Sequence, residues 1–316
     1  MAKYVLKRIL LLIPTLLLIL TLVFVLMRCI PGGPIRAMYA GEDLTPQEVE
    51  ELEEKYGFND PIWEQYLRYV GGIVKGDWGD SYFTQKPVFQ SILDVWEPTI
   101  MLTLCSTLIT VIIAIPVGIL SATHRNSLLD YFVTSTSMVS MTIPSICWGL
   151  LLLYVFAYKL DWFPMMGYET IEKGGLAGAL ICIALPSISL GTRHVASLAR
   201  YTRSTMLDVL SQDYIRTAKA KGLSKGKIYY KHALKNTLSV VATLIANSIA
   251  TMLGGSVVTE RVFNIRGIGM LALNSLSRRD YSQEQAIVLF CAIICLGVNL
   301  LMDIFYKALD PRIEYE

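Results

Sequence analysis

The chain has 316 residues, of which 53% are hydrophobic and 17% are charged, with a mean hydropathy of +0.48 and a formal net charge of +2. A soluble globular domain carries about 25% charged residues. Because the apolar residues are gathered in long uncharged runs, an ordinary soluble domain is excluded and a membrane protein with several spans is indicated. The six cysteines lie in or beside these runs without any Cys-x-x-Cys pair, so we interpret them as small buried side chains.

Six apolar runs are candidates to cross the bilayer core, which takes about 20 residues of helix. They are Ile9–Met27, Thr99–Ala122, Tyr131–Ala157, Leu176–Gly191, Leu238–Val258 and Ala286–Tyr306, of which the fourth is the shortest. Each of the first four contains a proline, so we expect bent helices packed in a bundle. The predicted fold class is an all-α integral membrane protein with six transmembrane helices.

Basic residues predict the orientation of these spans. The N-terminus is basic, and the connection Leu198–Thr237, between the fourth and fifth runs, carries nine Lys/Arg residues against two acids. Both therefore belong to the cytoplasmic side, and six spans return the C-terminus to that side as well. The expected divisions are 1–30 for the N-terminus and first span, 31–98 for an extracytoplasmic segment, 99–307 for a five-helix core with a cytoplasmic loop at 198–237, and 308–316 for the cytoplasmic tail.

The extracytoplasmic segment is predicted to be helical. Thr45, Pro46 and Glu48 form a capping box with proline at the first helical position, and Asp60-Pro61 begins a second helix. The acidic side chains of the first helix could suggest a cation site. A solvated helix face with acids near its N-terminus is the simpler interpretation, so we predict no metal site.

Charged side chains are missing from the interiors of the six runs, apart from Asp303 near the inner end of the last. The histidines, including His194, are placed near cytoplasmic ends. Ionisable residues within the bilayer usually mark ion or proton relays, so their absence argues against a proton- or sodium-coupled transporter. The chain also lacks nucleotide-binding, metalloprotease and nucleophile-elbow motifs. We predict no enzyme, no catalytic residue and no cofactor on this chain, with energy supplied from outside the spans.

The segment Asp213–Asn236 is the most structured of the basic connections. Asp213 is predicted to cap a short helix, Gly222 fits the left-handed position after it, and Leu223 fits the apolar position of a Schellman turn. Ser224 is predicted to begin a second helix that continues into the fifth span. A generic positive-inside loop and a site for anionic lipid are the alternatives. The presence of two capped helices favours the interpretation that this segment docks on another protein. A nucleic-acid patch is not expected beside the bilayer.

This segment resembles the EAA loop of ABC importer permeases. Thr217, Ala218, Gly222 and Leu234 match that pattern, while Arg216 stands where the founding glutamate would be. Arginine at that place is typical of the peptide/nickel branch of the family.

Further stretches resemble the same branch along nearly the whole chain, and the long segment after the first span resembles the B-type subunit. They are Lys7-Arg8-Ile9-Leu10, Ile30-Pro31-Gly32-Gly33-Pro34, Tyr56-Gly57-Phe58-Asn59-Asp60-Pro61, Gly76-Asp77-Trp78-Gly79, Glu260-Arg261-Val262-Phe263-Asn264, Gly267-Ile268-Gly269, Arg279-Asp280-Tyr281 and Leu309-Asp310-Pro311-Arg312. The resemblance implies the fold of a type I ABC importer permease, with a helical extracytoplasmic insertion between spans one and two.

The resemblance also implies partners. These are a homologous C-type permease subunit, two cytoplasmic ATPase subunits that carry ATP and Mg, an extracytoplasmic solute-binding protein and the lipid of a bacterial or archaeal cell membrane. Peptides, either dipeptides or oligopeptides, are the expected substrate. Nickel, another metal chelate or another small solute is the alternative within the family, and an ATP-independent channel is the alternative outside it.

Three sets of site residues follow as expectations. The ATPase-coupling residues are Asp213, Tyr214, Ile215, Arg216, Thr217, Ala218, Lys219, Ala220, Gly222 and Leu223. Polar and small residues of the fifth span are candidates for the translocation path, with tight helix packing as the alternative; they are Asn247, Ser248, Thr251, Gly254 and Gly255. The candidates for an outer gate are Glu260, Phe263, Gly267, Gly269 and Asp280.

Overall fold

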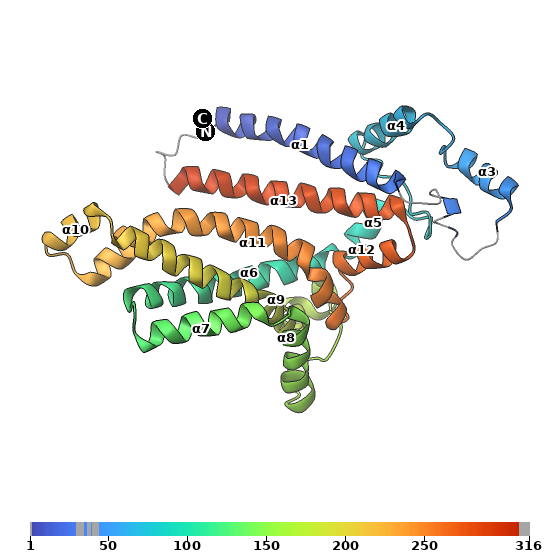
Figure 1. Cartoon of the computed structure of the whole chain (residues 1–316). Coiled ribbons are helices and arrows are strands. Elements are labelled where there is room, and N and C mark those ends of the chain that lie inside the picture. The colour runs from blue at the N-terminus through green and yellow to red at the C-terminus, as the bar shows by residue number, and fades with distance from the viewer. Residues whose placement is uncertain (1, 30–34, 37–38, 40–43, 310–316) are drawn as a thin grey trace. The chain divides into compact units, whose positions relative to one another are not determined.

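The computed structural model describes residues 2–29, 35–36, 39 and 44–309, and their regular structure is helical apart from one isolated antiparallel bridge (Figure 1). The elements are α1 (Ala2–Arg28), α3 (Pro46–Lys55), α4 (Ile62–Val74), α5 (Val88–Leu93), α6 (Trp96–Thr123), α7 (Leu128–Thr142), α8 (Ser145–Leu152), the π-helix η1 (Leu153–Lys159), α9 (Ile171–Leu210), α10 (Asp213–Ala220), the π-helix η2 (Lys227–Ala233), α11 (Leu234–Val262), α12 (Ile268–Ser277) and α13 (Tyr281–Leu309). The all-α prediction is confirmed. The family-like stretches at 30–34 and 310–312 lie outside the described residues.

The chain folds into two compact units, each described here by itself. The first contains Met1–Glu97 and Gly267–Gly297, and the second contains Pro98–Arg266 and Val298–Glu316. In the second unit α7 and α11 both pack against α9, and α10 lies at one end of these long helices (Figure 1). The second unit therefore holds both the basic segment and the predicted path residues.

Among the residues that the structure describes, four helices are long and apolar enough to cross a membrane, or up to six if each of two bent helix pairs counts as one span. The four lie at Leu10–Arg28, Trp96–Thr123, Ile171–Leu210 and Tyr281–Met302. The bent pairs are Leu128–Thr142 with Ser145–Lys159, at 99°, and Lys227–Leu238 with Val240–Gly254, at 49°. The prediction of six spans is met when each pair is counted as one.

The prediction that prolines bend the spans is confirmed at Pro144. Pro144 stands at the 99° bend, where it is the N-cap of α8 and the preceding Ile143 has the extended backbone that a following proline favours. At Pro14, Pro116 and Pro186 the helix continues through the proline. At Pro144 one helix ends and the next begins, whereas each of the other three prolines lies inside a single helix.

The fourth apolar run, predicted to be the shortest of the six, lies within a much longer helix in the structure. It belongs to α9, a 40-residue helix whose backbone leaves helical geometry only at Gly175, where φ is 66°. From there to its end α9 is about 50 Å long, at about 1.5 Å per residue. Hydropathy falls after Gly191, but neither proline nor glycine follows within the helix, so the backbone has no reason to stop. Arg193 and His194 are thus carried on the same continuous helix as the apolar run.

Small residues allow α6 to approach α9 closely. A Cβ atom added at Gly118 would lie 2.6 Å from the Cβ of Thr202, and one added at Gly191 would lie 3.3 Å from the Ser106 carbonyl oxygen. Such contacts are typical of helices that associate within membranes. The close crossing fixes α9 against α6 and so fixes the side chains that α9 presents to α11.

Candidate coupling helix and transport cavity

Helix α10 has the C-terminal turn that the sequence predicts. Gly222 has φ +76°, its N–H bonds to the Lys219 carbonyl at 3.0 Å, and the Leu223 N–H bonds to the Ala218 carbonyl at 3.3 Å. These are the two bonds of a Schellman motif. At the other end the N-cap residue is Gln212, without a side-chain capping bond, so the prediction that Asp213 caps the helix is wrong. Asp213 is instead the first residue of the helix, where its negative charge interacts favourably with the helix dipole.

The apolar edge of α10 faces inward. Ile215 and Ala218 are buried in a cluster with Ile119 of α6, Met206 of α9 and Ile228 of η2. The burial attaches α10 to the ends of three other elements. Its opposite face is exposed and mostly polar; the exposed predicted coupling residues are Asp213, Tyr214, Arg216, Thr217, Lys219, Ala220 and Gly222. Ile215 and Ala218 therefore hold the helix in place, while the exposed side chains are free to meet a partner.

A buried ion pair joins α7 to α9 in the same unit. Arg203 donates from Nε to Asp130 Oδ1 at 2.6 Å and from a terminal nitrogen to Oδ2 at 2.7 Å. Asp130 also accepts the Asn126 N–H at 3.0 Å and the Ser121 hydroxyl. All of these donors satisfy a carboxylate whose side chain is only 4% exposed. This pair is not predictable from local sequence, because its partners are 73 residues apart and no local motif connects them.

A cavity of about 480 Å³ lies between α9 and α11 in the second unit. The predicted path residues Asn247, Ser248 and Thr251 all line it. The rest of its lining is Met141, Ser145, Leu190, Arg193, His194, Ser197, Leu198, Tyr201 and Leu244. Gly254 lies outside the lining, and a Cβ added there would meet no atom within 4 Å, so no close helix contact within this chain requires glycine. The side chain at position 255 lies outside the described residues.

The five predicted outer-gate residues are divided between the two units. In the second unit, Glu260 is fully buried and accepts a hydrogen bond from the Thr99 hydroxyl at 2.7 Å, while Phe263 belongs to the apolar core. In the first unit, Gly267 precedes α12, Gly269 is buried within it, and Asp280 accepts the Tyr82 N–H at 3.2 Å. Each has a local packing or bonding role, and a gate remains a prediction.

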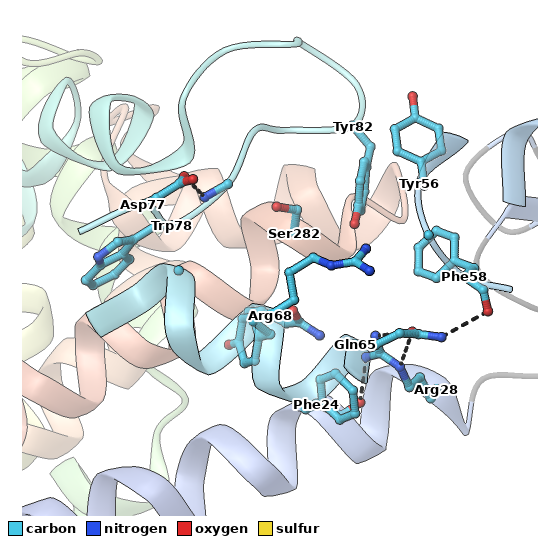
Figure 2. Close-up of a pocket in the computed structure, with 15 residues that line it drawn as sticks. Phe24, Arg28, Tyr56, Phe58, Gln65, Arg68, Asp77, Trp78, Tyr82 and Ser282 are labelled. Carbon is cyan, nitrogen blue, oxygen red and sulfur yellow. Dashed lines mark hydrogen bonds between the residues drawn. The ribbon is translucent and has the colours of Figure 1, made fainter. Parts of the chain in front are cut away.

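Residues of α1, α4, the loops that flank α4 and the start of α13 line a pocket of about 270 Å³ in the first unit (Figure 2). Gln65 is buried at its edge, where its Oε1 accepts from Arg28 at 2.7 Å and its amide donates to the Phe58 and Asp60 carbonyls at 2.9 and 2.8 Å. The Arg28 guanidinium lies 3.4 Å from the centroid of the Phe24 ring. Burial here raises the pKa of Tyr69 to about 12. Gln65 thus fastens α4 and the turn before it to the end of α1.

The predicted capping box at α3 is present. The Glu48 N–H donates to the Thr45 hydroxyl at 3.3 Å, and Glu48 Oε2 accepts from the Thr45 N–H at 2.8 Å. These bonds to Thr45 lower the pKa of the Glu48 carboxyl. No group of three His, Cys, Asp or Glu side chains within the described ranges could hold a metal ion.

A helical membrane protein with an anchored surface helix and a polar cavity between two spans has the features of a transporter's membrane subunit. Two family models match the chain: "Binding-protein-dependent transport system inner membrane component" over residues 114–315, and its N-terminal counterpart over residues 1–103. The chain belongs to this family, so it is a permease subunit of an ABC transporter, not an enzyme, and it is an integral membrane protein. The family resemblance seen in the sequence is confirmed.

Curated relatives are similar over the full length of both chains. The oligopeptide transport system permease protein AppB of Bacillus subtilis is 41% identical, and the dipeptide transport system permease protein DppB of Alkalihalophilus pseudofirmus is 36% identical. The glutathione transport system permease protein GsiC of Escherichia coli K12 is also 36% identical. Among solved structures, the inward-facing MetNI methionine ABC transporter matches with a TM-score of 0.58 at 17% identity, over 71% of this chain and 98% of that one. This match supports the type I importer fold.

Proposed function

We propose that this chain forms part of the translocation path of a peptide importer and receives energy through α10. Its partners would be a homologous C-type permease subunit, two ATPase subunits that hydrolyse ATP with Mg, and an extracytoplasmic solute-binding protein. Peptide is proposed because full-length relatives are named for oligopeptide, dipeptide and glutathione transport. The proposed orientation has α10 and both termini in the cytoplasm, and the basic residues of these connections support it.

The observation that carries the coupling proposal is the two-sided character of α10. Its buried side contacts residues of α6, α9 and η2, and its exposed side presents Arg216, Lys219 and Tyr214. A partner that moves α10 would therefore also move the inner ends of those helices. Such a movement becomes coupled to ATP hydrolysis when the two states of the ATPases differ in their contacts with α10.

Charge reversal on the exposed face of α10 tests this proposal. Arg216→Glu combined with Lys219→Glu should insert into the membrane normally but lose co-purification with the ATPases and lose peptide uptake. Lys173→Glu is the control, since Lys173 is an exposed lysine of α9 that we expect on the opposite side of the membrane. Unchanged uptake and ATPase association in the Arg216/Lys219 variant would refute the coupling role.

The substrate proposal needs its own measurement. The complete complex, reconstituted in vesicles, should accumulate a labelled dipeptide or oligopeptide when ATP and the binding protein are present. Uptake of nickel or a metal chelate in place of peptide would contradict the peptide assignment while leaving the permease class intact. Solute flux through this chain alone, without ATPase subunits, would favour a channel.

A further inference from the structure

The cavity between α9 and α11 contains a charged side chain deep within the helices. Its lining from α11 extends from Leu244 to Thr251, at least ten residues from either end of that helix. Its lining from α9 extends from Leu190 to Tyr201 and includes Arg193. The sequence analysis placed Arg193 beyond the end of the fourth span, whereas the structure places it beside the interior of α11.

A charged residue at this depth calls for a physical reason, because a cation within a membrane helix is costly and usually faces a cavity or a pathway. Arg193 is exposed to the cavity and pairs with no carboxylate in the part of the chain that the structure describes. The cavity lining contains no Asp or Glu, and His194, half-buried beside the Arg193 cation, adds an imidazole ring. The cavity is therefore cationic and suited to an anionic group.

The opposite wall supplies hydrogen-bond acceptors. The Ser248 hydroxyl donates to the Leu244 carbonyl at 2.8 Å, and the Thr251 hydroxyl donates to the Asn247 carbonyl at 3.0 Å. Because each hydroxyl proton is used within α11, the oxygen lone pairs remain to accept from a ligand. Asn247 adds a further carbonyl and an amide. A solute with a carboxylate and several N–H groups would find partners on both walls.

We infer that this cavity is a transient solute site within the translocation path and that Arg193 pairs there with a carboxylate of the solute. For a peptide that group is the C-terminal carboxylate, so the inference rests on the proposed function. Guanidinium and carboxylate match in a two-bond geometry that no neutral side chain reproduces. The volume of about 480 Å³ is within the range of small-molecule sites, about 300–1,000 Å³. A bare metal cation would be repelled by the same side chain.

The test measures uptake by the complete complex in vesicles, with a labelled peptide that has a free C-terminal carboxylate and with the same peptide C-amidated. Both are supplied at concentrations that saturate the binding protein, so that differences arise in the membrane. Arg193→Gln should lower uptake of the free-carboxylate peptide about tenfold or more, as expected for a lost hydrogen bond to a charged group. It should lower uptake of the amidated peptide much less.

Two further variants separate charge from structure. Arg193→Lys keeps the cation and should restore most uptake of the free-carboxylate peptide, whereas Arg193→Glu should lower it further than Arg193→Gln. Lys173→Gln, on the same helix but outside the cavity, should change neither peptide. Each variant is compared at equal amounts of assembled complex with measured basal ATP hydrolysis.

The outcomes are distinct. Equal losses for both peptides in Arg193→Gln, or no loss for either, would overturn the carboxylate site and indicate that Arg193 serves packing or pairs with another subunit. If the wild-type complex hydrolyses ATP but accumulates neither peptide, the proposed peptide function itself fails. A wild-type complex that takes up peptide, with Arg193 variants ordered Arg, Lys, Gln, Glu in activity, supports both proposals.

Discussion

Replacing Arg203 by methionine should destabilise the second unit, because it leaves Asp130 buried without its charged partner. The Asp130 side chain is 4% exposed and the Arg203 side chain 26% exposed, and the two share bonds of 2.6 and 2.7 Å. Removing one member of a buried pair costs about 3–5 kcal/mol. Because Arg203 is partly exposed and Asp130 keeps the Ser121 and Asn126 donors, we expect a cost near the lower end, about 3 kcal/mol.

The assay is thermal unfolding of the purified complex in detergent. A loss of about 3 kcal/mol corresponds to a fall in melting temperature of roughly 6–12 °C for a unit of this size. Arg200→Met is the matched control, since Arg200 is exposed one turn earlier and its recorded contact is a Tyr201 ring 5.8 Å away. It should change the melting temperature by no more than about 2 °C.

A double-mutant cycle completes the argument. Asp130→Leu combined with Arg203→Met removes both charges, so it should be more stable than Arg203→Met alone. The reasoning is refuted if Arg203→Met melts at the same temperature as Arg200→Met. It is equally refuted if the double variant loses as much stability as the two single variants added together.

Three other predictions follow from single contacts. Gly222→Ala should weaken coupled uptake, because an alanine at this left-handed backbone position is strained by about 1–2 kcal/mol, and Gly222→Asn should cost less. ATP-dependent uptake measures both variants. Equal activity of Gly222→Pro and wild type would contradict the role of the turn. Gln65→Leu should weaken the attachment of α4 to α1, because Arg28 and two carbonyls lose their hydrogen-bond partner. Proteolysis within residues 58–75 should be faster in this variant than in a Gln90→Leu control. The lowered pKa of Glu48 stabilises α3 above the ordinary carboxyl pKa, and this contribution should disappear as pH falls through the lowered value. Titration of Glu48 by NMR in wild type and Thr45→Ala checks it, since the shift should become smaller in the variant, which keeps the backbone N–H donor and loses the hydroxyl.

Two local signals were read correctly, although the N-cap of α10 is Gln212 and not the predicted Asp213. The glycine turn after α10 and the capping box at Thr45 each depend on residues fewer than six apart, and both are present. Only the fold shows that Ile215 of α10 packs against residues of α6 and α9.

Long-range features escaped the sequence analysis for physical reasons. The Asp130–Arg203 pair joins residues with no shared periodicity. The length of α9 was underestimated because hydropathy reports where a helix prefers lipid, not where its backbone ends. Arg193 lies just beyond the fourth apolar run in the sequence, and the cavity that it lines became visible only when α9 and α11 were placed side by side.

The wide turn of the π-helix η2 determines how α10 is rotated relative to α11 about the helix axis. The Leu234 N–H bonds to the Tyr229 carbonyl five residues earlier, and Ile228 and Ala233, also five apart, are both buried in the cluster under α10. In an α-helix, residues five apart point about 140° away from each other. The extra residue of a π-turn returns them to one face. Deleting one residue of η2 would rewind it into an ordinary helix and rotate α10 by about 100° relative to the cavity face of α11. The extra residue of η2 thus determines the angle between the exposed face of α10 and the cavity face of α11.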